Sequence, residues 1–505
     1  MPLARLVLAV GGGYLVGLAF PGANLWWAAP LGVALLGLAG WRARPANGLV
    51  AGLGAGLAYF APVLSWAGTY VGDLPWLALA TVESLYVAVM VWLTVLIQRP
   101  LIAAGRNGLA WAVVPLGWVV EELARSTTPY GGFPWARLAF SQADSPLARV
   151  AAYAGAPGVT FAVALVGTLL AGAVVALAGR RPTGAIPLVA AVAVVVLAGL
   201  IWLPTGGRPV TVALVQGNVP QAGLAFNAQR RAVLDDHVRE TLALAAHRPA
   251  DLALVVWPEN ASDIDPIANA DAAAEIRKVV TAIKVPLLLG AVIDGPGRYL
   301  SNTSLLYRTP TSTPERYVKQ HPVPFAEYIP DRSFFRRFSD KVDLVRRDFI
   351  AGGSRGEFHL TGPAGPFTVV PTICFEIAYD GLVRDEVTHA GPDPSLLVVQ
   401  TNNATFGRTD EAAQQFAISR IRAIEHGRSV AEVSTVGITG FVAPDGTASG
   451  RTRLFTAAQV VGRPVLRTGI TLADRLGGIP DAVAVGVLAF LAIGAAIARR
   501  RPGPR

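Results

Sequence analysis

The chain has a single cysteine, Cys374, among its 505 residues, so it cannot form an intramolecular disulfide. It also lacks the Cys/His spacings that are typical of zinc or haem sites. The six histidines are scattered without a metal-binding pattern: His237, His247, His321, His359, His389 and His426. A disulfide scaffold is therefore excluded, and we expect neither a metal nor a cofactor.

Charged residues are scarce as well. They make up 15% of the chain, against about 25% in an average soluble protein, while 52% of the residues are hydrophobic. Mean hydropathy is +0.46, which indicates that the protein lies partly in lipid. The net charge of +9 would suit nucleic acid if it were gathered in one patch. Because many arginines instead flank apolar segments, we expect a membrane and no nucleic-acid partner.

Long apolar runs are abundant. A bilayer core about 30 Å thick needs roughly 20 apolar helical residues. Seven stretches before residue 204 and one near the C-terminus come close to that length: 4–21, 24–41, 49–70, 75–97, 108–124, 155–178, 185–203 and 480–498. The first stretch is also compatible with a signal peptide, but the apolar run that begins at Leu25 favours a retained helix. The pattern predicts a polytopic α-helical membrane domain over 1–204, and a C-terminal transmembrane helix with a basic tail over 476–505.

The distribution of arginines predicts the orientation of these helices, because short cytoplasmic loops carry the excess of positive charge. The loops on the opposite side hold Arg125, Arg137 and Arg149. With the N-terminus inside, eleven arginines fall on the cytoplasmic side: Arg5, Arg42, Arg44, Arg99, Arg106, Arg180, Arg181, Arg499, Arg500, Arg501 and Arg505. Both termini are therefore predicted to be cytoplasmic, and residues 205–475 extracytoplasmic.

The pattern of residues 205–475 predicts a soluble α/β domain. Apolar runs suited to strands buried on both faces occur at 210–215, 252–256, 286–293, 367–373 and 396–400. Helical patterns lie between them, at 227–246, 268–284, 378–390 and 411–427. A segment of about 270 residues is long enough to bury its own core.

Cys374 ends one of the predicted strands. A tight turn from strand to helix can present a side chain beside a backbone N–H, which is the placement that an acyl-transfer nucleophile needs. The alternative is a structural role, since free cysteines are among the most buried residues.

Glu259 follows Trp257 and Pro258 at the end of another predicted strand, where α/β proteins usually place their sites. Burial beside Trp257 would raise the pKa of Glu259 and make it a better base; a solvated loop glutamate is the alternative.

Lys319 is one of four lysines against 39 arginines. A compact ammonium suits a developing oxyanion better than a guanidinium does. Glu327 and Glu376 lie close in sequence to Lys319 and Cys374 and are candidates for supporting roles.

Three motifs, taken in order, resemble the nitrilase superfamily with its Glu-Lys-Cys triad: Trp257-Pro258-Glu259, Lys319 followed by the run Pro324 to Pro330, and Cys374-Phe375-Glu376. With the membrane helices included, nearly the whole chain is similar to the apolipoprotein N-acyltransferase family, which completes bacterial lipoprotein maturation. Phe375 is a departure, because family members often have tyrosine after the nucleophile.

The resemblance implies an exported nitrilase-like αββα sandwich and a ping-pong reaction. Glu259 would take the proton of Cys374, whose thiolate would attack a phospholipid ester. Lys319 and a backbone N–H near Phe375 would stabilise the oxyanion. The acyl group would then pass to the α-amino group of a diacylated apolipoprotein. The site set is thus Glu259, Lys319 and Cys374, with Glu327, Phe375, Glu376 and Trp257 as supporting or substrate-binding residues. The partners implied are a phospholipid donor and a diacylated apolipoprotein acceptor in the bacterial inner membrane, and nothing demands more than a monomer.

Two other functions stay open at this point. A membrane-tethered amidase would use the same triad with water as the acceptor, although one helix would suffice as its anchor. A lipid-handling protein without enzyme activity would carry ionisable residues inside its helices, for which Glu83, Glu121 and Glu122 are the main candidates. Phe334, Phe335 and Phe338, interleaved with arginines, suggest either an arm that dips into the interface or an ordinary loop with core aromatics.

Overall fold

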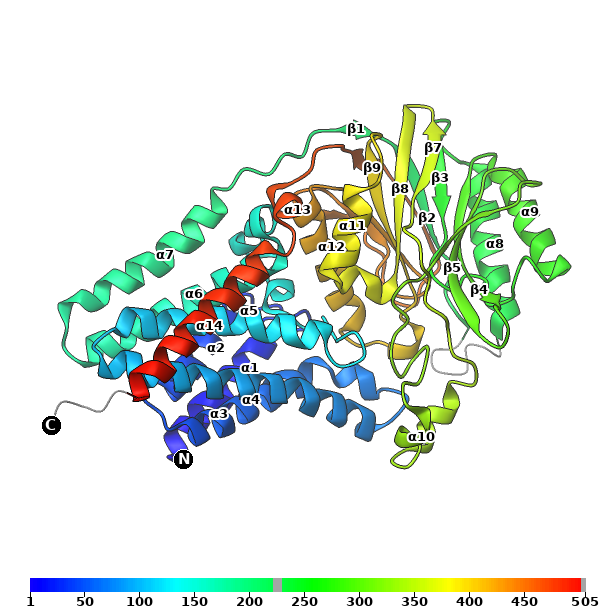
Figure 1. Cartoon of the computed structure of the whole chain (residues 1–505). Helices are drawn as coiled ribbons and strands as arrows, with labels where there is room; N and C mark the ends of the chain where they lie inside the picture. Colours follow the sequence, from blue (N-terminus) through cyan, green and yellow to red (C-terminus); the bar gives the residue numbers. More distant parts are fainter. Residues whose placement is uncertain (221–228, 501–505) are drawn as a thin grey trace. The chain divides into compact units, whose positions relative to one another are not determined.

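The structure is a computed structural model that describes residues 1–220 and 229–500, and it divides into two compact units. The helical unit contains residues 1–68, 72–202 and the chain from 475 onward, and the α/β unit contains residues 69–71 and 203–474. Figure 1 shows the helices of the first unit and the sheets of the second. The predicted helix start at 227, and Arg501 and Arg505 of the charge count, lie outside the described residues.

The helical unit is built from apolar helices, as the sequence predicts. Among the described residues, five segments are long and apolar enough to cross a membrane: Pro45–Val63, Asp73–Ala103, Pro146–Ala178, Pro182–Gly199 and Ile479–Ile497. Helices α1 and α2 are apolar but shorter. The helix bounds are α1 Leu3–Leu18, α2 Ala28–Gly40, α3 Pro45–Val63, α4 Asp73–Ala103, α5 Asn107–Thr127, α6 Ala151–Ala178, α7 Ala185–Gly199 and α14 Ile479–Arg500.

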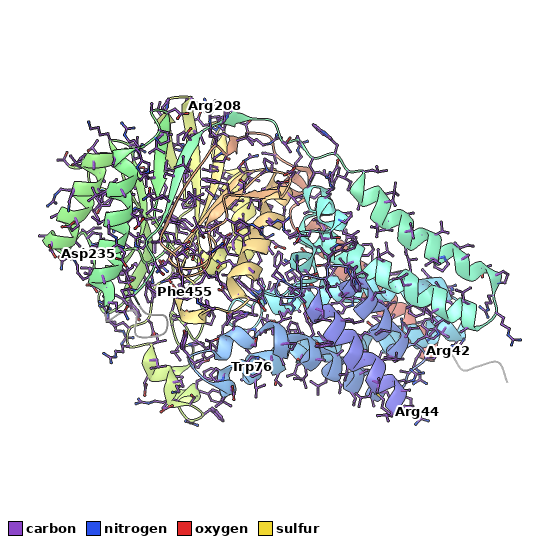
Figure 2. The ribbon with its side chains drawn as sticks, turned by 180° about the vertical axis from the view of Figure 1, so that it is seen from behind. Arg42, Arg44, Trp76, Arg208, Asp235 and Phe455 are labelled. Atoms are coloured by element: carbon purple, nitrogen blue, oxygen red, sulfur yellow. The ribbon has the colours of Figure 1, made fainter. Side chains whose placement is uncertain are left out.

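Small residues let these helices approach closely. A Cβ built on Gly12 of α1 would lie 2.7 Å from the carbonyl oxygen of Gly32 on α2. A Cβ on Gly52 of α3 would lie 2.6 Å from the Cα of Ala88 on α4. Helices in lipid associate largely through such close packing, because lipid tails are as apolar as the side chains and the hydrophobic effect does not drive the helices together. Figure 2 shows Arg42 and Arg44 at the end of the helical unit opposite Trp76.

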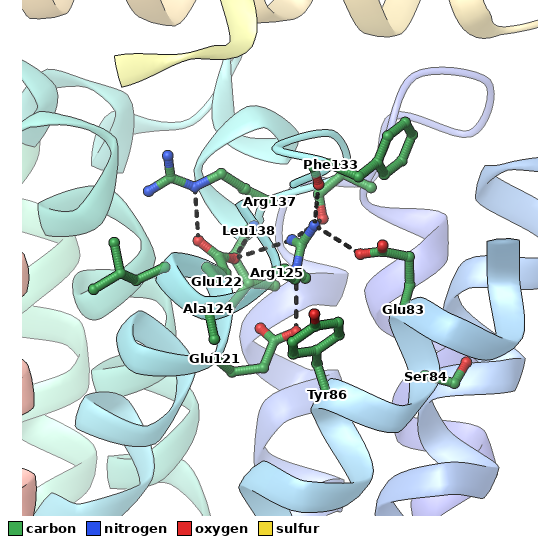
Figure 3. A network of polar contacts seen from close by, with 12 residues as sticks. Glu83, Ser84, Tyr86, Glu121, Glu122, Ala124, Arg125, Phe133, Arg137 and Leu138 are labelled. Carbon is green, nitrogen blue, oxygen red and sulfur yellow. Dashed lines mark hydrogen bonds and ion pairs between the residues drawn. The ribbon is translucent and has the colours of Figure 1, made fainter. Parts of the chain in front are cut away.

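A buried charge network joins α4, α5 and the segment that follows α5 (Figure 3). The Arg125 guanidinium forms ion pairs with Glu83 at 3.4 Å, with Glu121 at 3.1 Å and with Glu122 at 3.9 Å. Arg125 also donates to the carbonyls of residues 133, 135 and 136. Arg137 pairs with Glu122 at 3.1 Å. The network therefore fixes the connection between α5 and α6 through side chains that the orientation count had placed in a loop. Arg125 is a buried residue of α5 and not of a loop, and Arg137 is buried in the connection that follows α5.

Removing the central cation of this network should destabilise the protein. In Arg125→Met, the three glutamates keep only Arg137 as a counter-charge, and we expect the free energy of unfolding to fall by about 3 to 5 kcal/mol. The measurement is denaturant unfolding of the detergent-solubilised protein, followed by tryptophan fluorescence. Arg106→Met is the matched control, because Arg106 is exposed. Equal stability of the two variants would contradict a structural role for the network.

The α/β unit contains two six-stranded sheets and a two-stranded ribbon, with strand orders β13-β2-β3-β4-β5-β6, β12-β11-β10-β9-β8-β7 and β1-β14. The strand bounds are β1 Arg208–Pro209, β2 Thr211–Gln216, β3 Leu252–Val256, β4 Leu287–Asp294, β5 Leu300–Tyr307, β6 Glu315–Val318, β7 Phe358–Gly362, β8 Gly365–Ile373, β9 Ser395–Thr401, β10 Val430–Ser434, β11 Gly440–Val442, β12 Ala448–Ser449, β13 Ala458–Gly462 and β14 Val465–Leu466.

The two sheets share one apolar core and each is covered by helices on its other face. Buried side chains of β2, β3, β8 and β9 pack together in the shared core. Helices α8 (Arg230–Ala246) and α9 (Ala270–Ile283) cover the first sheet through a second buried cluster. Helices α11 (Asp380–Thr388) and α12 (Glu411–His426) contact the other sheet. These layers form the predicted αββα sandwich (Figure 1). The remaining described helices are the short α10 (Arg332–Phe335) and α13 (Leu472–Leu476).

Helix α10 carries the predicted arm of aromatic and basic residues, and none of its residues is buried. Phe334 and Phe338 are 50% and 66% exposed, so they are not core aromatics. Their rings contact each other with centroids 5.2 Å apart. The membrane-facing role of this arm stays a prediction.

Candidate active site

Three strand ends supply the predicted catalytic side chains. Glu259 follows β3 by three residues, Lys319 comes directly after β6, and Cys374 comes directly after β8. Strands β3 and β6 belong to one sheet and β8 to the other. The αββα packing of the two sheets brings Cys374 to Glu259 and Lys319, so that residues 115 positions apart in the chain, Glu259 and Cys374, share one buried site.

Lys319 lies between two carboxylates. Its Nζ is 3.3 Å from Oε1 of Glu259 and 2.8 Å from Oε2 of Glu327. The lysine is 1% exposed, and Glu259 is 5% exposed. Glu327 is held in turn by the backbone N–H of Val323, which donates to its Oε2 at 2.7 Å. Burying a cation in this way is favourable only because both carboxylates face it.

Asn302, which the sequence did not single out, completes this cluster. Its Nδ2 donates to Oε1 of Glu259 at 2.7 Å and to Oε1 of Glu327 at 2.8 Å. The backbone N–H of Lys319 donates to the carbonyl of Asn302 at 2.9 Å, so the same residue also fixes the chain that carries the lysine. Asn302 is therefore a bridge that sets the separation of the two carboxylates.

Cys374 adopts a backbone conformation that is unusual for a residue other than glycine. Its φ is +55°, at the first residue of the 3₁₀ turn Cys374–Ala378. Residues other than glycine rarely adopt such angles outside turns and functional sites. The thiol is half-buried, and the Glu259 carboxylate lies close enough for its charge to act on it. The turn thus directs the sulfur toward the cluster formed by Glu259 and Lys319.

Glu376 connects the cysteine turn to the segment that follows Lys319. Its carboxylate accepts hydrogen bonds from the backbone N–H groups of Ile373 at 2.8 Å and Gln320 at 2.6 Å, and from the hydroxyl of Tyr317 at 3.0 Å. It is fully buried. Glu376 therefore supports the site by holding two loops together and not by facing the reacting groups.

Trp257 and Phe375 are both buried, at 0% and 5% exposure. The Trp257 indole N–H donates to the hydroxyl of Thr241 at 2.8 Å, and its ring packs in the cluster beneath α8 and α9. Trp257 is therefore placed to support β3, the strand that leads to Glu259, because helices α8 and α9 cover its ring. The Phe375 ring lies edge-on to Tyr379, with centroids 5.4 Å apart.

The electrostatics of the site favour a protonated Cys374 thiol in the resting state. Burial raises the pKa of the Glu259 carboxyl, although Lys319 opposes the rise. Burial and the negative charge of Glu259 also raise the pKa of the Cys374 thiol. Burial alone would lower the pKa of Lys319, but Glu327 and Glu259 outweigh it and raise that pKa. The lysine is therefore a permanent cation, and the resting thiol keeps the proton that Glu259 must accept.

A glycine on β4 makes room for Glu259. A Cβ on Gly290 would lie 2.6 Å from the Cα of Glu259 and would also meet the carbonyl of Pro258. Gly290→Ala should therefore displace the carboxylate and reduce acyl transfer by at least about 10-fold, because displacements of about 1 Å can cost 100-fold. Gly381→Ala on α11, where a Cβ meets nothing within 4 Å, is the matched control. Unchanged activity of the Gly290 variant in a steady-state assay would contradict this reading of the contact.

The chain matches two family models and is similar to several known proteins. Residues 12–169 match the model of the apolipoprotein N-acyltransferase N-terminal domain, and residues 211–461 match that of carbon-nitrogen hydrolase. The chain is 40% identical to an apolipoprotein N-acyltransferase of Mycolicibacterium smegmatis, over 95% of this chain and 83% of the relative. It is 33% identical to one of Ralstonia nicotianae, over 99% and 95%. A solved nitrilase-superfamily amidase variant from Nesterenkonia aligns with 55% of this chain and 96% of its own, at 15% identity and a TM-score of 0.38.

A carbon-nitrogen hydrolase domain in one chain with long apolar helices defines a membrane-bound member of that superfamily. The chain belongs to the apolipoprotein N-acyltransferase family, and it is an acyltransferase. The amidase and the non-enzymatic alternatives are disfavoured accordingly.

Proposed function

We propose that the protein transfers a fatty acyl chain from a membrane phospholipid, through a thioester on Cys374, to the α-amino group of the diacylglyceryl cysteine that begins an apolipoprotein. The observation that carries the proposal is the buried ion pair of Lys319 with Glu259 at 3.3 Å, beside which the turn after β8 places the Cys374 thiol. These are the three groups that acyl transfer through a thiol requires: a nucleophile, a base and a cation for the oxyanion.

In the first half-reaction, Glu259 accepts the thiol proton and the sulfur attacks the ester carbonyl of the phospholipid. Negative charge develops on the carbonyl oxygen, where the Lys319 ammonium and a backbone N–H near Phe375 stabilise it. The tetrahedral intermediate collapses as Glu259 returns its proton to the departing alkoxide. One carbon-sulfur bond has formed and one carbon-oxygen bond has broken, and the products are an acyl-enzyme and a lysophospholipid.

In the second half-reaction, the amino group of the apolipoprotein attacks the thioester carbonyl. Glu259 takes a proton from the attacking nitrogen and returns it to the leaving sulfur. The amide product is a triacylated lipoprotein, and the free thiol is regenerated. A neutral amine is required, so transfer is expected to fall at pH values where the acceptor amine is protonated.

We further propose that the domain over 205–475 lies outside the cytoplasm and that both termini lie inside, with the protein acting as a monomer in the bacterial inner membrane. The support is the excess of arginines in the loops assigned to the cytoplasm. Both substrates are lipid-anchored, so a catalytic domain joined to membrane helices meets them by lateral diffusion. Cysteine-labelling of introduced residues with an impermeant reagent in whole cells tests this orientation.

The experiment that tests the transfer uses two synthetic diacylated lipopeptides, one with a free α-amino group and one with that group acetylated. Purified protein and a phospholipid of defined acyl chains are supplied in mixed micelles. We expect one added acyl chain on the free-amine peptide only, detected by mass spectrometry. Release of free fatty acid at the same rate with either peptide, and no acylated peptide, would refute the transferase and indicate hydrolysis.

A further inference from the structure

The hydroxyl of Thr401 lies between two possible acceptors. Its Oγ1 is 3.5 Å from the Sγ of Cys374 and 2.8 Å from Oε1 of Gln415. Both contacts have the length of a hydrogen bond for their atom types, since sulfur is the larger acceptor. A hydroxyl has a single proton, so it can donate to only one of the two at a time.

The fold places this hydroxyl rigidly. Thr401 is the last residue of β9, and β9 pairs in parallel with β8 so that Gln400 is opposite Ile373, the residue before the cysteine. Thr401 is fully buried, and so is Gln415 on α12. The strand register therefore brings the threonine beside the nucleophile, and neither side chain is free to turn toward solvent.

The second acceptor is held in place by its own partners. Asn403 donates through Nδ2 to Oε1 of Gln415 and to Oε2 of Glu411, both at 2.8 Å. The hydroxyl of Ser434 donates to Oδ1 of Asn403 at 2.5 Å. The position of the Gln415 carbonyl is thus fixed whether or not Thr401 donates to it. What can change is the acceptor of the Thr401 hydroxyl proton, which is either Gln415 or Cys374.

The charges around the sulfur explain why a neutral hydrogen-bond donor would help to stabilise the thiolate. The charged or titratable groups that act on Cys374 are Glu259 and Glu411, which oppose its ionisation, and Lys319, which favours it. The lysine is shared with Glu259 and Glu327, so its charge is largely compensated before the thiolate forms. A neutral hydroxyl that turns to the sulfur stabilises the thiolate without a further cation in a buried site.

We propose that Thr401 is the hydrogen-bond donor to the Cys374 thiolate, and that Gln415 is the positioning residue that accepts the same proton while the sulfur is protonated or acylated. The inference rests on the proposed function for the role of Cys374 as nucleophile. The hydroxyl proton stays on its oxygen throughout and only changes direction, so no atom is transferred. The thiol proton itself still goes to Glu259.

The test measures how readily Cys374 forms its thiolate, using the rate of alkylation by iodoacetamide, a neutral reagent. Full-length protein in detergent is compared across pH 6 to 10. In Thr401→Val, which keeps the shape and removes the hydroxyl, alkylation at pH 8 should be slower by about five- to ten-fold, the size expected for a hydrogen bond to a charged group less the bond to Gln415. Thr401→Ser keeps the donor and should stay within about two-fold of the unsubstituted protein, on the same reasoning.

Gln415→Leu gives a prediction of opposite sign. Without the competing acceptor, the threonine donates to the sulfur alone, so alkylation at pH 8 should be faster by about three-fold or more. General damage to the site cannot accelerate one variant and slow the other. Alkylation of Thr401→Val at the unsubstituted rate, or slowing in both variants, would overturn the inference. If Thr401→Val does not fold, the Gln415→Leu rate decides it.

Failure of this inference is separable from failure of the proposed function. Alkylation reports on the thiol alone, and acylation by phospholipid is measured separately on the unsubstituted protein. Normal acylation with an unchanged Thr401→Val alkylation rate would refute only the donor. A shifted alkylation rate in a protein that phospholipid never acylates would refute only the transferase.

Discussion

Lys319→Met is expected to reduce acyl-enzyme formation by at least about 1,000-fold. Removing one preorganised donor from an oxyanion site typically costs 100- to 1,000-fold, and this substitution has a second consequence. The ammonium is the group that opposes the rise in the pKa of Glu259. Without it, Glu259 and Glu327 share a buried site with no cation between them, so the base is expected to remain protonated near neutral pH. The variant loses the oxyanion partner and the base together.

The measurement is the single-turnover rate of acylation by phospholipid, followed by quenched-flow mass spectrometry. Lys278→Met is the matched control, because Lys278 is a surface residue of α9 that pairs with Glu275. We expect the control to acylate at the unsubstituted rate. A Lys319→Met protein that folds and retains a tenth or more of that rate would contradict the assigned role of the lysine.

Glu259→Gln is expected to separate two properties that a damaged site would lose together. The negative charge of Glu259 raises the pKa of the Cys374 thiol, so its removal should lower that pKa and let iodoacetamide alkylate the thiol at lower pH. Acyl-enzyme formation should nevertheless fall by at least about 100-fold, within the usual range for loss of a general acid-base group. The reason is that the variant lacks the Glu259 carboxyl, which protonates the departing alkoxide.

Both quantities are measured on the same preparation, with Glu315→Gln as the control, since Glu315 is a surface carboxylate on β6. The sign of the alkylation shift is the informative result. A thiol that alkylates more slowly in Glu259→Gln while acylation is unaffected would mean that the carboxylate activates the sulfur in some other way, and the proposed proton path would be wrong.

The sequence predicts the strands that form long, continuous apolar runs. Strands β2, β3, β4, β8 and β9 lie within the sheets and appear as continuous apolar runs. Strand β5 is missed because Ser301, Asn302, Thr303 and Ser304 are polar although they are all buried. Strand β6 is missed because it has only four residues, two of them exposed. Strand β5, which the sequence patterns fail to find, thus carries Asn302, the bridge between two carboxylates of the site.

The candidate site is predictable in its principal residues and not in its supporting contacts. Glu259 and Cys374 follow predicted strands, and strand ends are where α/β proteins gather functional groups. Lys319 follows a strand that the sequence does not predict, and the scarcity of lysine is what singles it out. The partners Asn302, Thr401 and Gln415 are found only from pairing and register, because they come from separate elements and their residue types are ordinary. In the helical unit, the sequence places Arg125 in a loop. The structure instead buries it in α5, where it forms ion pairs with three glutamates of α4 and α5.

The most direct test of the account is the intact mass of the full-length protein after incubation with a phospholipid of one defined acyl chain and no acceptor. The account predicts an added mass of one acyl group, localised to Cys374 by peptide mapping, released by neutral hydroxylamine and absent in Cys374→Ala. Addition of a free-amine diacylated lipopeptide should discharge it. A protein that acylates the lipopeptide while Cys374 never carries the acyl group, or with Cys374 replaced by alanine, would contradict the central claim.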